Sequence, residues 1–566
     1  MLLVVFVERT LAIVFPHSFS SSDLTAEAPT ERTLTAADIA DLADELVAYH
    51  AEFAPLFKRY EQRAWAKIYL HGLLTADVPR KNIEALALRL FGADEAAGRT
   101  VRALQQFVGE GGWDDDAILA KHRRLVDESL GEDDGVLIID GSDFPKQGSH
   151  SAGVARQWCG HTGKKDNCQA GVFLGYASRK GYTLLDRQLY LPACWFTPEY
   201  QARWQAARIP DDAPFRTKHE LAAELVEHAM AGDDLRARWV VCDEGYGDDP
   251  ALLDRFAATG LWYLAEVPRD TQVWPLVEAD GQTPCARPTR WIPPQKPSRK
   301  GPAPQRERLH PTSPAKVPLN RYAAQIPPER WQRCRVLEGS KGPLVADFAA
   351  VRVIAVRDRL PGPEVWAVFR RTVAGPDEDT ELKVYLSCAP AETPLLTLVR
   401  VSGMRWPIEA CFAEGNGELG MDHYELRFWR GWHHHMTLVI LAHHFLVRLQ
   451  QRLNQREGAH PAAGRCLGWN GDQPRIARSN VVLDRRPRSG NRRAQRVRAK
   501  PDALPPAVLS ALAQRLQSDR GTHRLTRRPP AADVRCPGGA GPARLPAPPQ
   551  SRRVSIASQA HAQTAC

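Results

Sequence analysis

The spacing of hydrophobic residues changes near residue 135, which divides the chain into a helical first part and a strand-rich middle. From residue 36 to about residue 130, large apolar side chains recur at roughly helical spacing, as in amphipathic helices. Thr35 and Asp38 resemble the start of the first helix, and further helices are predicted over 85–90 and 100–108. The recurring residues are Leu42, Leu46, Phe53, Phe57, Tyr60, Trp65 and Tyr69.

Beyond residue 135, short apolar runs bounded by turn residues predict buried strands. Segments 170–177 and 182–191 flank the turn 178–181 and are predicted to form a hairpin. The expected order is strand 135–140, this hairpin, helix 218–231, strand 239–242, helix 250–259 and strand 261–267. This order favours an α/β fold with a mixed sheet.

The remaining chain differs in composition from this α/β part. Segment 284–318 is crowded with proline, lysine and arginine and is predicted to lack regular structure, whereas strands resume at 351–356, 364–370 and 382–386. Past Glu457 no glutamate occurs, and arginine and proline dominate. We therefore predict six regions: a disordered or over-long start (1–34), a helical domain (35–130), a catalytic core in two parts (131–269 and 391–457), an insertion (270–390) and a mostly disordered basic tail (458–566).

Composition narrows the class of protein. With 566 residues, 43% hydrophobic and 25% charged, the chain is typical of soluble multidomain proteins. The net charge of +9 favours a polyanionic partner, although much of the excess lies in the tail. Eleven cysteines without a CxxC pair argue against structural zinc and disulfides and suit a reducing cytoplasm. The apolar start is interrupted by Glu8 and Arg9, so no membrane role is expected.

Three carboxylates are the candidate chemistry. Asp140 ends the apolar run 136–139, Asp243 ends the run 239–242, and Glu409 lies near the start of a predicted helix. Acids on rigid elements suit a hard cation such as magnesium, which prefers oxygen ligands. Two such ions can clamp the attacking and the leaving oxygen of a phosphodiester.

Other titratable groups compete with this interpretation. Glu414 lies five residues beyond Glu409, about 140° around the helix, so both cannot face one metal well; Glu418 is a second rival on that helix. Five histidines, at 433–435 and 443–444, fall in or beside an apolar helix (436–449) without carboxylate or cysteine partners. We interpret these histidines as packed or surface residues rather than metal ligands.

Several segments together resemble bacterial insertion-sequence transposases of the DDE superfamily endonuclease group. The resemblance covers roughly residues 45 to 450 and is carried by segments 140–157, 159–163, 166–169, 185–192, 242–247, 405–409 and 417–425. It implies an RNase H-like core in which Asp140, Asp243 and Glu409 match the metal-binding triad. It also implies two magnesium ions, for which manganese is a possible substitute. The implied reaction is hydrolysis at a transposon end, then attack of the freed 3′-hydroxyl on target DNA.

The resemblance also implies the partners: double-stranded DNA, as terminal inverted repeats and target, and a second copy of the chain as a homodimer. The expected location is the cytoplasm, at the nucleoid. Whether region 35–130 binds DNA or only packs is left open. The candidate DNA-binding residues are Arg405, Lys146, Arg156, Lys164, Lys165 and Asn416. For the four residues in the predicted loops after the first strand, Lys146, Arg156, Lys164 and Lys165, a merely solvated basic loop is the alternative.

Two positions depart from the family pattern. Ser402 stands where many relatives carry tyrosine, and Asn416 stands where they carry lysine. Two alternatives to an active transposase remain, and these departures motivate the second. One is a structure-selective RNase H-like nuclease without strand transfer, and the other is an inactive DNA-binding remnant of a mobile element.

Overall fold

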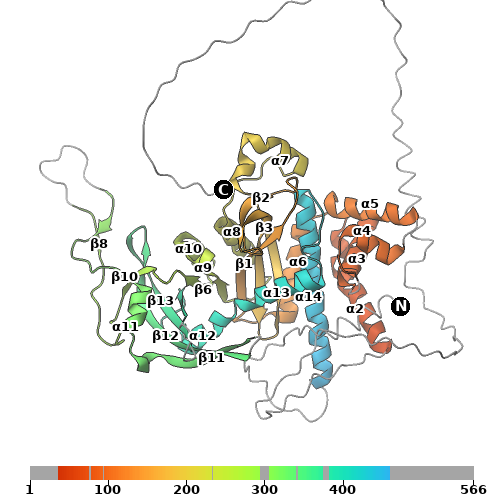
Figure 1. The fold of residues 1–566 in the computed structure, drawn as a ribbon. Helices are drawn as coiled ribbons and strands as arrows, with labels where there is room; N and C mark the ends of the chain where they lie inside the picture. The colour runs from red at the N-terminus through yellow and green to blue at the C-terminus, as the bar shows by residue number, and fades with distance from the viewer. Residues whose placement is uncertain are drawn as a thin grey trace, which may run out of the picture. The chain divides into compact units, whose positions relative to one another are not determined.

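The computed structural model describes residues 36–458, except 76–77, 93–94, 233, 294–304, 340–341 and 374–380 (Figure 1). The predictions for the start (1–34), for part of the Pro/Lys/Arg-rich segment and for the tail beyond 458 lie outside the described residues. None of the helices in the described ranges has the length and apolar character needed to cross a bilayer.

The helical first region is confirmed. It contains α2 (Ala36–Phe53), α3 (Tyr60–Leu74), α4 (Ile83–Phe91), α5 (Glu95–Gly109) and α6 (Asp115–Leu130). Side-chain caps set two of the starts: Asn82 accepts from the backbone N–H of Ala85, and Asp114 accepts from that of Ala117. The apolar faces of these helices supply buried residues such as Phe53 and Leu73 to the core.

The centre of the fold is a mixed sheet built from the predicted strands. Its strands are β1 (Val136–Pro145), β2 (Ala155–Cys159), β3 (Lys164–Ser178), β4 (Gly181–Tyr190), β5 (Trp239–Cys242) and β6 (Trp262–Val267). Strand β3 pairs antiparallel with β1, β2 and β4, whereas β1, β5 and β6 are parallel. The spatial order β4–β3–β1–β5–β6 is that of an RNase H-like core, and the predicted α/β class is confirmed.

Helices connect the parallel strands of this core. Between β4 and β5 lie α7 (Gln201–Ala207) and α8 (Lys218–Met230), and between β5 and β6 lie α9 (Glu244–Gly247) and α10 (Pro250–Ala258). Helix α8 begins at a capping box in which the Thr217 side chain and Glu220 satisfy each other's backbone N–H groups. The buried faces of α8 and α10 pack on strands whose side chains are buried on both faces, as for Val240.

The sheet continues without a break into the region 270–390. Strand β14 (Leu382–Ser387) pairs antiparallel with β6, and β13 (Leu360–Thr372), β12 (Gly342–Arg357), β7 (Gln272–Pro275) and β10 (Val317–Pro318) follow in that order. Strand β11 (Gln332–Gly339) pairs with β12, while β8 (Arg290–Trp291) and β9 (Arg308–Leu309) form a separate ribbon. One hydrophobic cluster joins both parts, because it includes Val240 and Val353.

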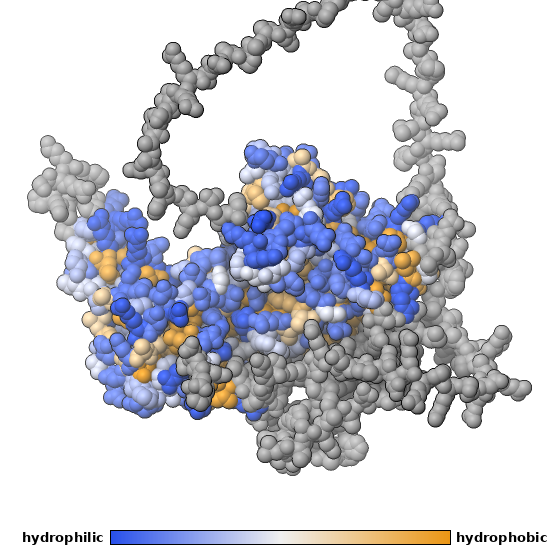
Figure 2. All heavy atoms as spheres, viewed as in Figure 1, coloured by the Kyte–Doolittle hydropathy of each residue, from blue (hydrophilic) through white to orange (hydrophobic). Residues whose placement is uncertain are grey.

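Three helices complete the described chain: α12 (Leu395–Gly403), α13 (Trp406–Glu418) and α14 (Trp429–Gly458). Helix α14 packs against β4 and against the N-terminal helices α3, α5 and α6, which lie beside it in Figure 1. Its five histidines are buried, so packing rather than surface exposure is confirmed: the His434 ring stacks on Trp113 at 3.6 Å, and His435 shares a 2.9 Å hydrogen bond with Tyr69. The expected lack of carboxylate partners is wrong for His443, which pairs with Glu414. On the face shown in Figure 2, hydrophilic residues cover most of the described surface.

Candidate active site

Asp140 lies on β1, one residue beyond the last parallel pair with β5, Ile139 with Cys242. The expected strand end at Asp140 is wrong, because β1 continues to Pro145 along β3. The reason is the length of β3, whose Phe173 and preceding residues offer antiparallel partners where β5 has already ended. Asp140 therefore projects from the middle of a strand, with its side chain 16% exposed.

Asp243 follows β5 and is the N-cap of the short helix α9. Its Oδ1 accepts a hydrogen bond from the backbone N–H of Tyr246 at 3.2 Å. The residue therefore has the helix-capping role that is common for an acid after a strand. Its charge nevertheless reaches the same site, since it acts on both Asp140 and Arg405.

Glu409 lies in the first turn of α13, as predicted, with Pro407 at a helix-starting position. Its side chain is 47% exposed. The rival Glu414 points elsewhere: its carboxylate accepts from Tyr182 Oη at 2.6 Å and pairs with His443 Nε2 at 2.8 Å. That engagement leaves Glu409 as the acid of α13 that faces Asp140.

The guanidinium of Arg405 joins two of the three acids. Its Nη1 donates to Asp140 Oδ2 at 3.0 Å, and its Nη2 forms a second ion pair with Glu409 Oε1. The negative charge of Asp243 also acts on it. Sequence alone predicted a phosphate contact for Arg405. In the structure its positive charge lies among the acids, in the position expected for a metal cation.

Electrostatics make this a site that favours positive charge. Burial, followed by the negative charge of Asp243, raises the pKa of Asp140 to about 7, while Arg405 and the N–H of Gly141 oppose the shift. A carboxylate that is hard to ionise beside other carboxylates gains from a bound cation. The three side chains offer only oxygen donors, which suits magnesium.

The donor set fits a divalent ion, but the three acids are not gathered into a ligand cluster. Within the described ranges, no three acidic, histidine or cysteine side chains stand close enough together to ligate a metal. Metal binding would therefore require Arg405 to move away and the acids to close in.

Residues 52–343 match the family described as DDE superfamily endonuclease. The chain belongs to this family. The matched range contains Asp140 and Asp243 and ends before Glu409, so the role of Glu409 depends on its position beside Asp140.

The chain is similar to one curated protein and can be aligned with one solved structure. The "Probable transposase for insertion sequence element IS701" of Microchaete diplosiphon is 28% identical over 218 residues, which are 38% of this chain and 50% of that protein. The chain thus spans about half the length of this curated relative. A cryo-EM structure of the piggyBac transposase synaptic complex with hairpin DNA aligns with 75% of this chain and 80% of that one, at 9% identity. The TM-score of this alignment is 0.28.

The candidate DNA-binding residues lie in different environments. Lys146 Nζ lies 3.6 Å from the centre of the Tyr424 ring, and burial lowers its pKa to about 8. Asn416 is partly buried, and its side-chain oxygen has no hydrogen-bond partner among the described residues. Ser402 is buried and donates to the carbonyl of Val399 at 2.7 Å.

Arg156, Lys164 and Lys165 do not lie in loops, and this part of the loop prediction is wrong. Arg156 belongs to β2, and Lys164 and Lys165 begin β3, so all three are on an antiparallel hairpin. The glycines and polar residues around the hairpin concealed the alternation that marks a strand. All three side chains are exposed.

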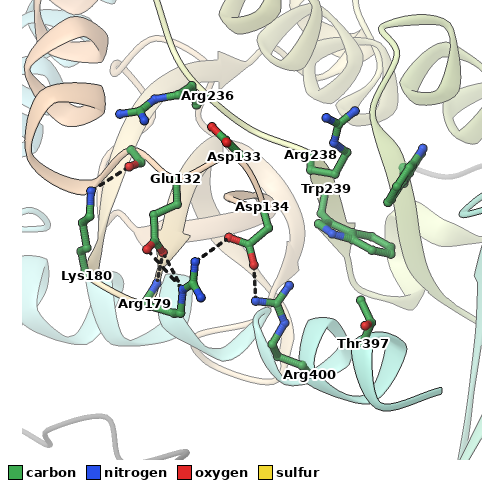
Figure 3. Close-up of a pocket in the computed structure, with 12 residues that line it drawn as sticks. Glu132, Asp133, Asp134, Arg179, Lys180, Arg236, Arg238, Trp239, Thr397 and Arg400 are labelled. Atoms are coloured by element: carbon green, nitrogen blue, oxygen red, sulfur yellow. Dashed lines mark hydrogen bonds and ion pairs between the residues drawn. The ribbon is translucent and has the colours of Figure 1, made fainter. Parts of the chain in front are cut away.

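A cavity of about 650 Å³ lies at the opposite ends of the core strands, just before β1, β5 and β6 (Figure 3). Two of its arginines are already paired: Arg179 with Glu132 at 3.2 Å and Arg400 with Asp134 at 2.5 Å. Asp140 lies beyond the last β1–β5 pair and Asp243 follows β5, so both are at the other ends of these strands and the cavity is not part of that site.

Sequence reasoning missed several residues that shape the site. Tyr182 and His443 fix Glu414, and buried Lys81 donates to the carbonyl of Glu418 at the end of α13. No local signal marks these long-range contacts. Trp158 was also missed, although an aromatic residue among Arg156, Lys164 and Lys165 is a visible signal.

Proposed function

We propose that this chain is a magnesium-dependent DNA transposase that cleaves transposon ends and joins the freed 3′-hydroxyl to target DNA. The observation that supports it most directly is the meeting of Asp140 and Glu409 on one guanidinium, within the field of Asp243. Family membership supports the class of reaction, and these acids are the candidate site for it.

In this proposal Asp140, Asp243 and Glu409 hold two divalent ions. Bound magnesium would polarise the scissile phosphate, lower the pKa of the attacking hydroxyl and stabilise the leaving oxygen. Arg405, the cation nearest these acids, would then grip a backbone phosphate. No protein nucleophile is needed, because water and the DNA 3′-hydroxyl attack in turn.

The proposed partners are double-stranded DNA, as terminal inverted repeats and target, and a second copy of the chain. Two transposon ends must be brought together, which a homodimer would do. The IS701 relative is named as a probable transposase of an insertion sequence element, which supports a DNA substrate of this kind. The proposed place of action is the nucleoid.

The test uses purified protein, magnesium and labelled DNA that contains the sequences flanking the gene. We expect wild-type protein to nick and join this DNA. Asp140→Asn, Asp243→Asn and Glu409→Gln should each abolish cleavage, because each removes an anionic metal ligand, while DNA binding stays within about threefold. Glu418→Gln, on the same helix as Glu409, is the matched control and should cleave normally.

Each other outcome has a definite meaning. Retained cleavage in one of the three variants would remove that residue from the metal site. Nicking without joining would favour the structure-selective nuclease. Binding without nicking by the wild type would favour the inactive remnant. This alternative is motivated by Ser402, which is buried, and Asn416, which is partly buried, because both depart from the family pattern.

A further inference from the structure

Trp158 is an exposed tryptophan on an edge strand. Its side chain is 61% exposed, although tryptophan is normally well buried in folded proteins. It lies on β2, which pairs only with β3 among the described strands. Within the described ranges, no aromatic or cation–π partner is found for its ring. The large, flat, apolar ring of Trp158 is thus exposed to solvent.

The residues around Trp158 are basic. Arg156 lies two residues earlier and therefore on the same face of β2, and Lys165 lies directly across from Trp158 on β3. Both are exposed, and neither forms an ion pair with another described residue. Lys164, the neighbour of Lys165, lies on the other face of β3, 3.8 Å from Asp166. The face thus combines one aromatic ring with two cations that no described acid neutralises.

This hairpin is attached to the strand that carries Asp140. The backbone N–H of Gly160, at the hairpin tip, donates to Asp143 Oδ2 at 2.6 Å. Asp143 is three residues beyond Asp140 on β1, a separation of about 10 Å along a strand. Trp158, two residues before Gly160, thus belongs to an element held close to the candidate active site.

We propose that this face binds DNA at an unpaired base: the Trp158 ring stacks on the base, and Arg156 and Lys165 contact the phosphates beside it. Every base offers a flat π surface, and aromatic stacking flanked by cations is how proteins hold unpaired strands. A protein partner fits less well, because exposed arginine and lysine beside the ring favour a polyanion. The inference rests on the proposed function only in taking DNA to lie across the neighbouring acids.

The experiment measures binding alone, without magnesium, so that its failure is distinct from a failure of cleavage. Two labelled DNAs of the same length are compared, one fully paired and one with a short unpaired stretch that contains 2-aminopurine. We expect the wild type to bind the second DNA about tenfold more tightly and to quench its fluorescence. Trp158→Ala should lose both effects, and Trp158→Phe should keep most of the preference because a smaller ring still stacks.

Two sets of controls separate stacking from charge and from folding. Arg156→Gln and Lys165→Gln should weaken binding to both DNAs equally, and each should lower the slope of log affinity against log salt by about one. Tyr60→Ala removes another exposed aromatic ring, 56% exposed on α3, and should change nothing. Since Trp158 is exposed, its variants should melt within about 2 °C of the wild type.

The proposal is overturned if Trp158→Ala retains the preference for unpaired DNA and the quenching. It is also overturned if Trp158→Ala leaves DNA binding intact but changes the oligomeric state, because the face would then bind protein. If the wild type does not cleave DNA but still binds unpaired DNA through Trp158, the proposed reaction is rejected and the proposed base-binding site is retained.

Discussion

At the scale of single residues, the main feature of the site is that Arg405 stands where cations are expected. It pairs with Asp140, 265 positions away in sequence, and with Glu409, four positions away on the same helix. The second pair follows from helical spacing and was predictable. The first was not, because only the folded chain brings β1 beside α13. The sequence predicted the acids but not what neutralises them.

This arrangement predicts that Arg405 competes with magnesium. In Arg405→Gln the metal need not displace a guanidinium, so half-saturation by magnesium should occur at roughly fivefold lower concentration, the equivalent of an ion pair of about 1 kcal/mol. Without metal this variant should melt below the wild type, because Asp140 and Glu409 lose their counter-charge. Thermal melting against magnesium concentration measures both effects.

Arg400→Gln is the matched control for Arg405→Gln. Arg400 is 25% exposed and pairs with Asp134, whereas Arg405 is 27% exposed. Its variant should lose some stability but should keep the wild-type response to magnesium. Equal half-saturation in the two variants and the wild type would show that Arg405 does not compete with the ion.

At the scale of elements, α13 is held at its far end while its first turn faces the acids. Glu414 is fixed by Tyr182 from β4 and by His443 from α14. The ammonium of Lys81 is buried between two helix ends, where it donates to Leu73 O of α3 at 2.5 Å and to Glu418 O of α13. A cation at a helix C-terminus satisfies carbonyls that have no partner within the helix and opposes the helix dipole. The helical first region is thereby coupled to the helix of Glu409.

Lys81→Met should therefore destabilise the protein by about 2–3 kcal/mol, because two buried carbonyls lose a charged donor. Urea unfolding monitored by circular dichroism measures this change. Lys58→Met, at an exposed lysine in the same region, should stay within about 0.5 kcal/mol of the wild type. A loss at Lys81 no larger than at Lys58 would contradict the role assigned to this ammonium.

The positions of helices and strands along the sequence were more predictable than the pairing of the strands in the sheet. The hairpin of β3 and β4, helices α8 and α10, and the strand after residue 260 follow from periodicity and turn residues, which are local properties. Strand segments 351–356, 364–370 and 382–386 were also predicted, but not their addition to the edge of the core sheet beside β6. Pairing depends on register between distant segments, which the pattern of one strand does not encode.

At the scale of the whole molecule, a set of buried histidines joins the helical region, the sheet and α14. His122 Nε2 bonds to the carbonyl of Leu184 on β4, and His444 lies between Tyr49 and Ser129. Burial lowers the pKa of each histidine in the set below its usual value near 6.5. The pKa falls to about 4 for His50, His122 and His434, to about 3 for His433 and His435, and well below the usual value for His444.

These shifts predict early acid unfolding. Each histidine is neutral when folded and gains a proton below pH 6.5 when unfolded, so stability is complete above about pH 6.5. It decreases as pH falls from there toward 4, by up to about 1.4 kcal/mol per pH unit for each histidine. Asp140, with a pKa raised to about 7, acts in the opposite direction with one proton. Because the histidines outnumber Asp140, the net effect is a loss of stability as the pH falls.

The measurement is the free energy of unfolding in urea at pH 7, 6 and 5, before most carboxylates titrate. We expect a steep decline over this interval. His434→Gln should reduce the slope by about one proton, because it removes one group that is protonated only on unfolding. His150→Gln changes an exposed histidine and should leave the slope unchanged. A free energy that stays constant from pH 7 to pH 5 would mean that these histidines are already protonated in the folded protein, and that burial does not exclude the charge.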